Sequence, residues 1–185
     1  MSLEAVVLAL SLTAQAAPAP SPEVRDQVRA LLGNIDTRVP PETFRALGPG
    51  AEEALADFAR EEQGSPLRRV HALEALAGLG GARAEAVHRE VLARSTAPRA
   101  VRRAAVRGLG RLAGPRRAAA ELSPVLEQDS DPVVRATAAE ALAAHAPADA
   151  CARIRARALV EPAPSRFHRA LTTCDRASRA GSRRR

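Results

Sequence analysis

The chain has 185 residues, enough for one domain, and 46 % of them are hydrophobic, many of these being alanine. With no tryptophan or tyrosine, it lacks the usual platforms for stacking the bases of single-stranded nucleic acid, and an alanine-rich core buries little area per residue. All 28 basic residues are arginine and the formal net charge is +7, but residues 175–185 hold five arginines and one aspartate, so the folded part is only mildly basic.

Residues 1–16 are predicted to be an export signal. They contain an apolar run too short to span a bilayer, and Ala14-Gln15-Ala16 matches a signal-peptide cleavage site. Against this, Glu4 stands where a signal peptide carries positive charge, so a hydrophobic helix packed on the following domain is the alternative. Residues 17–22 are predicted to be a linker, because Pro18-Ala19-Pro20 favours an extended chain.

Residues 23–174 are predicted to form one helical domain. It is expected to begin with a cap helix and a degenerate helix pair, at residues 23–33, 41–47 and 51–62. Prolines open the first two helices, and Gly48-Pro49-Gly50 is the break before the third. It is expected to end with a cap helix over residues 165–174. Residues 175–185 are predicted to be a disordered basic tail, because they offer nothing to bury.

Three copies of one helical stripe occupy the middle of the chain. In each copy Arg, Ala, an apolar residue and Leu fall at i, i+3, i+4 and i+7, which is one face of a helix. The copies lie 33 residues apart, a period typical of stacked helical repeats. They are Arg69-Ala72-Leu73-Leu76, Arg102-Ala105-Val106-Leu109 and Arg135-Ala138-Ala139-Leu142.

A second predicted helix follows each stripe after a break at Gly or Pro. Its marker pairs recur at spacings of 34 and 33, as Val91-Leu92, Val125-Leu126 and Ala158-Leu159. Pro124 lies inside the middle one and predicts a kink there, with a late helix start near Ser123 as the alternative. The repeating unit is therefore a pair of helices, and the predicted fold class is all-α.

The segment from Asp129 to Arg135, followed by Ala138 and Leu142, resembles a HEAT repeat. The resemblance covers residues 65–160, and more weakly 41–64. It implies an armadillo-like, right-handed α-solenoid of stacked antiparallel helix pairs with cap helices at both ends. It also implies an Asp–Arg ladder between neighbouring repeats, although Ser65 and Pro98 replace Asp in the first two copies. The implied ladder residues are Asp131, Arg69, Arg102 and Arg135, and the leucines expected in the core are Leu76, Leu109 and Leu142.

The sequence carries no recognisable catalytic or metal-binding pattern. The four histidines are scattered, no two of them are spaced i, i+4, and there is no glycine-rich phosphate loop. We therefore expect a protein that is not an enzyme and needs no metal or cofactor.

The predicted function is a non-catalytic protein-binding scaffold, exported to the periplasm or the cell exterior. Helical repeats present an extended concave surface, and their second helices carry Arg89, Arg153, Arg155 and Arg157, a patch suited to an acidic protein partner. A solvated arginine face is the alternative reading of this patch. A cytoplasmic protein that binds nucleic acid, and a HEAT module like those of phycobilin lyases, are the alternative functions; export would exclude the first.

Cys151 and Cys174 are the only two cysteines and are predicted to form a disulfide. An even number of cysteines behind an export signal favours pairing. Two antiparallel helices joined by the turn at Pro162 and Ala163 would also bring the cysteines level with one another. Two buried free thiols in a cytosolic protein are the alternative.

Overall fold

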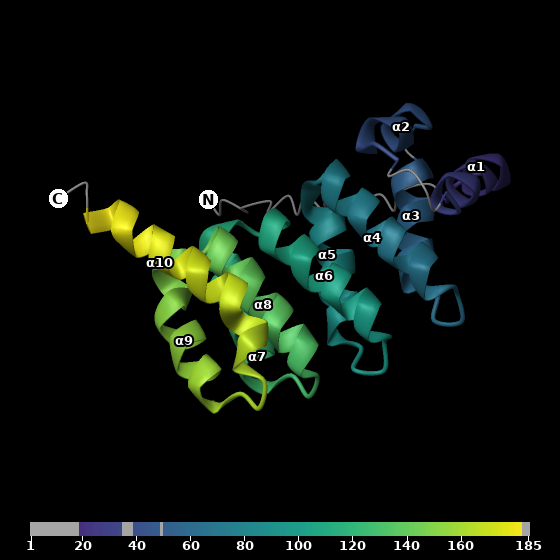
Figure 1. Cartoon of the computed structure of the whole chain (residues 1–185). Coiled ribbons are helices and arrows are strands. Elements are labelled where there is room, and N and C mark those ends of the chain that lie inside the picture. The colour runs from purple at the N-terminus through teal and green to yellow at the C-terminus, as the bar shows by residue number, and fades with distance from the viewer. Residues whose placement is uncertain (1–18, 35–38, 49, 183–185) are drawn as a thin grey trace, which may run out of the picture.

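The computed structural model describes residues 19–34, 39–48 and 50–182, which form ten α-helices and one 3-10 helix and contain no β-strand (Figure 1). The predicted export signal lies outside these residues, as do residues 17 and 18 of the predicted linker, whereas Ser21 and Pro22 at its end cap and begin the first helix. The helices are α1 (Pro22–Leu32), α2 (Pro41–Ala46), α3 (Gly50–Arg60), α4 (Pro66–Leu79), α5 (Gly81–Ala93), α6 (Arg99–Leu112), α7 (Gly114–Gln128), α8 (Pro132–His145), α9 (Pro147–Val160), η1 (Pro164–Phe167) and α10 (His168–Ser182).

The helices are arranged in two layers. The first helices of the repeats, α4, α6 and α8, pack side by side in chain order, and α10 continues this layer beside α8 (Figure 1). The second layer contains α3, α5, α7 and α9, and each of these helices packs against the first helix that follows it in the chain. The predicted all-α solenoid of stacked helix pairs is therefore confirmed.

Local sequence signals set the ends of these helices. Gly80, Gly81 and Gly114 have φ values of 80°, 90° and 68° in the tight turns within repeats, a region of backbone space that favours glycine. Before α8, the Asp131 carboxylate accepts a hydrogen bond from the backbone N–H of Val133 at 2.8 Å, which caps the helix.

The core consists of two clusters rather than one. Leu76 belongs to the N-terminal cluster, whereas Leu109 and Leu142 belong to the C-terminal cluster, and all three leucines are buried. Leu92 of α5 is partly buried and packs against both clusters. The stripe residues therefore face the interior of the stack, but the interior is divided at α6.

The buried positions of the second helices differ from those that the repeat spacing predicted. Leu126 of α7 is buried, whereas Leu159 of α9 is 87 % exposed and its neighbour Ala158 is buried instead. The buried residues Ala118, Leu122 and Leu126 of α7 recur in α9 as Ala150, Ile154 and Ala158, a spacing of 32 residues rather than 33. Pro115 and Pro147 have the same spacing. A shift of one residue turns a helix by about 100°, so α9 presents Leu159 to solvent.

The middle second helix, α7, is continuous from Gly114 to Gln128 with Pro124 inside it. The alternative of a late start near Ser123 is therefore wrong. The Ser123 hydroxyl donates a hydrogen bond to the carbonyl oxygen of Ala119 at 2.7 Å, a bond that often bends a helix. The kink itself stays a prediction.

The last helix is longer than the sequence suggested, because α10 passes the predicted end at Cys174 and continues to Ser182. Asp175 accepts a hydrogen bond from Arg155 of α9 at 3.0 Å, and the Ser178 hydroxyl donates to the carbonyl oxygen of Cys174 at 3.0 Å. These contacts attach the beginning of the predicted disordered tail, residues 175–185, to the folded domain. Residues 183–185 lie outside the described part of the chain.

Cys151 of α9 and Cys174 of α10 form the predicted disulfide, with their Cα atoms 5.5 Å apart. Replacing both cysteines by alanine is expected to lower the free energy of unfolding by about 3 kcal/mol, because the bond restricts the unfolded chain over a separation of 23 residues. Urea unfolding of the oxidised protein and the double variant measures this loss. Faster amide hydrogen exchange in α10 should accompany it, and unchanged protection of α10 would contradict the expected role of the bond.

His88 of α5 is fully buried against Gly108 of α6. A Cβ atom at position 108 would overlap the Cδ2 and Nε2 atoms of the ring, so the glycine makes room for the histidine. The ring's Nδ1 donates a hydrogen bond to the carbonyl oxygen of Ala84 at 2.7 Å, whereas Nε2 has no hydrogen-bond partner among the described residues. This contact explains a glycine in the interior of a helix, where it is otherwise unfavourable.

Acidification is expected to destabilise the protein through His88. Burial lowers the pKa of His88 below its ordinary value of 6.5, and the carbonyl groups of Ala84 and Leu73 offset this only in part. The unfolded chain therefore binds a proton near pH 6.5 that the folded protein does not bind, so stability is complete above that pH and falls as the pH drops through it. Urea unfolding of the wild type and His88→Leu from about pH 8 to about pH 5 tests this. The stability of the wild type relative to His88→Leu should fall toward acid pH, and a constant difference would contradict the expectation.

Candidate functional site

The four arginines predicted to bind a partner lie on the second helices, with Arg89 on α5 and Arg153, Arg155 and Arg157 on α9. Arg157 is half-buried and the other three are exposed. Each of the four forms an ion pair with a carboxylate of the same chain. The positive charge of this surface is therefore largely compensated within the protein.

Several ion pairs cross the junctions between successive second helices. A terminal nitrogen of Arg89 on α5 lies 2.7 Å from Glu121 of α7, and this hydrogen bond raises the pKa of Arg89. Arg153 of α9 lies 3.5 Å from Glu127 of α7. Exposed pairs of this kind stabilise a protein only slightly, but they fix the positions of the side chains. Further pairs across these junctions are Arg60–Glu90, Arg83–Glu53 and Arg117–Glu85.

Two of the predicted ladder arginines bind neighbouring segments. Arg69 donates a hydrogen bond from Nε to a backbone carbonyl oxygen of α3 at 3.1 Å. Arg102 pairs with Asp129 in the loop before α8. Asp131, to which the resemblance gives the ladder role, pairs with Arg99 while it caps α8. The loop before α8 thus uses two aspartates to hold the first turn of α6.

The third ladder arginine, Arg135, forms the most buried ion pair among the described residues. Its Nε and Nη2 atoms lie 2.5 and 2.7 Å from the two carboxylate oxygens of Glu161, and its Nη1 donates to the carbonyl oxygens of Asp129 and Ser130. Arg157 also pairs with Glu161, at 2.7 Å. The hydrogen bond from Arg135 lowers the pKa of Glu161, and the same bond raises the pKa of Arg135. This cluster fastens the end of α9 to the start of α8.

One apolar surface was missed by the sequence reasoning. Leu159 and Val160, at the end of α9, are 87 % and 70 % exposed, and Ala152 and Ala156 are exposed on the same helix. The signal that could have revealed it was the spacing of Pro115 and Pro147, which is one residue short of the repeat period. We call the surface formed by Ala152, Arg155, Ala156 and Leu159 the open side of α9.

The corresponding side of α7 borders a groove beside α9, where Ser123 is buried but Ala120 and Glu127 stay exposed. The groove between the two helices is lined on α7 by small and polar side chains and on α9 by Asp149 and Arg153. Among the described residues no second helix follows α9, because α10 lies in the first-helix layer beside α8 (Figure 1). The open side of α9 is therefore the place where a further second helix would pack. Its residues Ala152, Arg155 and Leu159 correspond to Ala120, Ser123 and Glu127 of that groove.

The described residues contain no group of three or more His, Cys, Asp or Glu side chains that could hold a metal ion. Of the scattered histidines, His71 bonds through Nδ1 to the carbonyl oxygen of Leu32 at 3.0 Å, and His88 fills the core contact with α6. Within the same part of the chain, no helix has the length and apolar character needed to cross a membrane.

Comparison with known proteins agrees with this architecture. A family of HEAT repeats matches residues 52–143 and again residues 88–172, which together make up more than half of the chain. The chain therefore belongs to the HEAT-repeat family, a class of helical-repeat modules that generally mediate protein interactions. No curated protein and no solved structure matches it.

Proposed function

We propose that the protein is a non-catalytic protein-binding scaffold and that a helix of its partner docks on the open side of α9. The observation that supports this proposal is the 87 % exposure of Leu159, on a side of α9 that no further second helix of the described chain covers. An exposed leucine flanked by alanines offers apolar surface that another helix can approach closely. The partner segment is therefore an amphipathic helix with apolar residues on one face.

The partner helix is proposed to be acidic. Arg155 lies on the open side, where its only carboxylate within the described chain is Asp175, at 3.0 Å. In an earlier repeat Arg89 of α5 pairs with Glu121 of the next second helix, so a partner carboxylate near Arg155 would repeat that arrangement. Arg153 and Arg157 face α7 and Arg89 lies on α5, so these three arginines lie outside the proposed contact.

Capture of the partner from cell extract by the immobilised full-length protein tests this site. A variant with Arg155→Glu and Leu159→Gln should lose the partner, because it removes the apolar contact and reverses the charge. The matched control is Arg116→Glu, which makes the same change of charge at an exposed arginine that has no ion pair with a described residue. Equal capture by the two variants, with unchanged helical circular dichroism, would overturn the proposed site.

Export of the protein is also proposed. The disulfide between Cys151 and Cys174 supports an oxidising compartment. Mass spectrometry of the native protein from fractionated cells should find an N-terminus near Ala17 in an extracytoplasmic fraction. An intact N-terminus in the cytoplasm, together with two reactive thiols in denaturant, would contradict export without affecting the proposed partner site.

A further inference from the structure

A cavity of about 480 Å³ lies at the N-terminal end of the stack, at the opposite end from α9 (Figure 1). It lies between α1, α2 and α4, and Arg111 near the end of α6 completes its lining. This volume falls within the range of pockets that bind small molecules. The cavity is therefore large enough to hold a ligand, and it is independent of the proposed partner site.

Part of the cavity wall is apolar, and Asn34 and His71 are polar side chains that line it as well. The close approach of Pro41 to Gly78 holds α2 against α4 beside it, because a Cβ atom at position 78 would overlap the proline ring. Leu31 and Val39 are the partly exposed apolar side chains of this wall, and covering them with the apolar body of a ligand is favourable. The apolar side chains of the wall are Leu31, Leu32, Val39, Phe44 and Ala75.

Charged groups gather at the mouth of the cavity. Glu74 is engaged by Arg107, with 3.6 Å between a carboxylate oxygen and a terminal guanidinium nitrogen. Arg111 is exposed and forms no ion pair with any other described residue. Among the described residues, the charge in this lining that has no ion pair is therefore that of Arg111, and its guanidinium can meet an anion.

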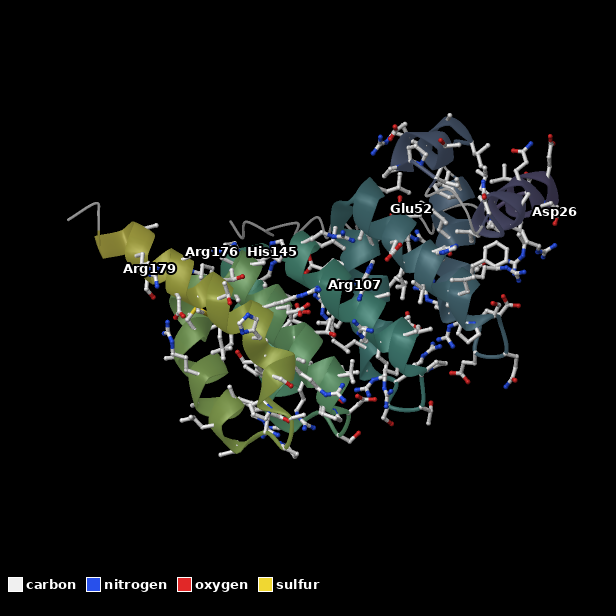
Figure 2. All side chains as sticks on the ribbon, in the orientation of Figure 1. Asp26, Glu52, Arg107, His145, Arg176 and Arg179 are labelled. Atoms are coloured by element: carbon white, nitrogen blue, oxygen red, sulfur yellow. A yellow bond between two sulfur atoms is a disulfide. The ribbon has the colours of Figure 1, made fainter. Side chains whose placement is uncertain are left out.

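The outer face of α6 adds to this positive charge. Arg103, Arg107 and Arg111 lie at i, i+4 and i+8, and Arg103 bonds to the hydroxyl of Thr137 at 3.0 Å rather than to a carboxylate. Burial, with the charges of Arg103 and Arg111, lowers the pKa of Arg107 despite the opposing charge of Glu74. Figure 2 shows Arg107 on α6 and His145 on the neighbouring α8, and burial together with the charge of Arg111 lowers the pKa of His145.

We propose that this cavity binds a small amphiphile with an apolar body and a carboxylate head. Arg111 binds the head, because a guanidinium offers a carboxylate two parallel hydrogen bonds. The apolar wall holds the body. A cationic amphiphile of the same length meets the charge of Arg111 at the mouth and binds less tightly.

Competition between dodecanoate and the fluorescent probe 1-anilinonaphthalene-8-sulfonate on the full-length protein tests this proposal. The probe combines an aromatic body with an anionic head, and the chain has no tryptophan or tyrosine to contribute background emission. One probe molecule should bind per chain and dodecanoate should displace it. Dodecanoate should also raise the melting temperature, because a ligand of the folded state stabilises that state. Absence of saturable displacement would overturn the proposal.

Single substitutions then test the two parts of the site. Arg111→Gln should weaken dodecanoate binding by about tenfold or more, the effect of losing a charge-assisted hydrogen bond. Arg116→Gln removes the same charge from an exposed arginine outside the cavity and should bind like the wild type. Ala77→Glu places a carboxylate on the cavity wall and should shift the preference toward dodecyltrimethylammonium. Equal affinity of Arg111→Gln and the wild type for dodecanoate would overturn the assignment of the head group.

Discussion

Gly108→Ala is expected to lower the free energy of unfolding by about 4 kcal/mol, although alanine is the better helix former. On an exposed helix the same exchange would stabilise the protein by about 1 kcal/mol. Here the added methyl group would overlap the ring of His88, which is fully buried and has no room to withdraw. Overfilling a well-packed core commonly costs about 1–3 kcal/mol, and overlap with a rigid ring places this case at or above that range. Urea unfolding followed by circular dichroism measures the loss.

A His88→Ala background should reverse the sign of this effect. The space left by the ring can accept a methyl group, so Gly108→Ala should then be neutral or stabilising, and the coupling between the two sites should be large. Gly110→Ala on the same helix is the matched control, because its Cβ atom would meet the Cβ of Ala141 at 3.0 Å and the Cδ2 of His145 at 3.2 Å, contacts much less close than that with the His88 ring. Similar losses at both glycines, or additive effects of Gly108→Ala and His88→Ala, would contradict the contact.

Glu161→Gln is expected to lower the free energy of unfolding by about 3 kcal/mol. Glu161 and Arg135 are only 6 % and 8 % exposed, and the carboxylate is the one negative charge that Arg135 contacts directly. Removing one member of a buried pair leaves the other charge without compensation, which typically costs about 3–5 kcal/mol. The carbonyl oxygens of Asp129 and Ser130 still accept bonds from Arg135 and keep the cost near the lower end. Urea unfolding near neutral pH measures the change.

Asp175→Asn is the control for this experiment, because it removes the charge from the exposed pair with Arg155 and should cost less than about 1 kcal/mol.

Acid should produce part of the stability loss of Glu161→Gln in the wild type as well. The pKa of Glu161 is lowered by its bond with Arg135, so its contribution is complete above the ordinary value of 4.5 and disappears as the pH falls through the folded value. Glu161→Gln should lack this part of the acid transition. Equal costs of the two substitutions would show that burial of the pair contributes nothing.

The features that the sequence predicted well are those that depend on neighbouring turns of one helix or on a repeated spacing. Leu76, Leu109 and Leu142 are buried because each recurs at the same place on the first helix of a repeat. The disulfide followed from two cysteines equidistant from one turn, which two antiparallel helices bring level. Such arguments need only the periodicity of a helix and the length of a repeat.

The features that were not predicted depend on contacts between elements. Arg102 pairs with Asp129 rather than Asp131 because the loop before α8 places Asp131 at the helix cap. Leu159 is exposed because a one-residue difference in spacing turns α9, a change too small to disturb the repeat pattern. The cavity depends on how α1 and α2 sit against α4, and neither of these two helices carries the repeat stripe that fixes the others.

The division of the core at α6 has a mechanical consequence. Val101 and Ala105 of this helix pack in the N-terminal cluster, Val106 and Leu109 pack in the C-terminal cluster, and Leu92 is a side chain shared by both. A small rotation of one half of the stack relative to the other would therefore act on the packing of α6 against its neighbours while each cluster stayed intact. The disulfide stiffens only the C-terminal half. Bending would concentrate at α6, and an elastic deformation there would change the separation between the cavity and the open side of α9 without unfolding either end.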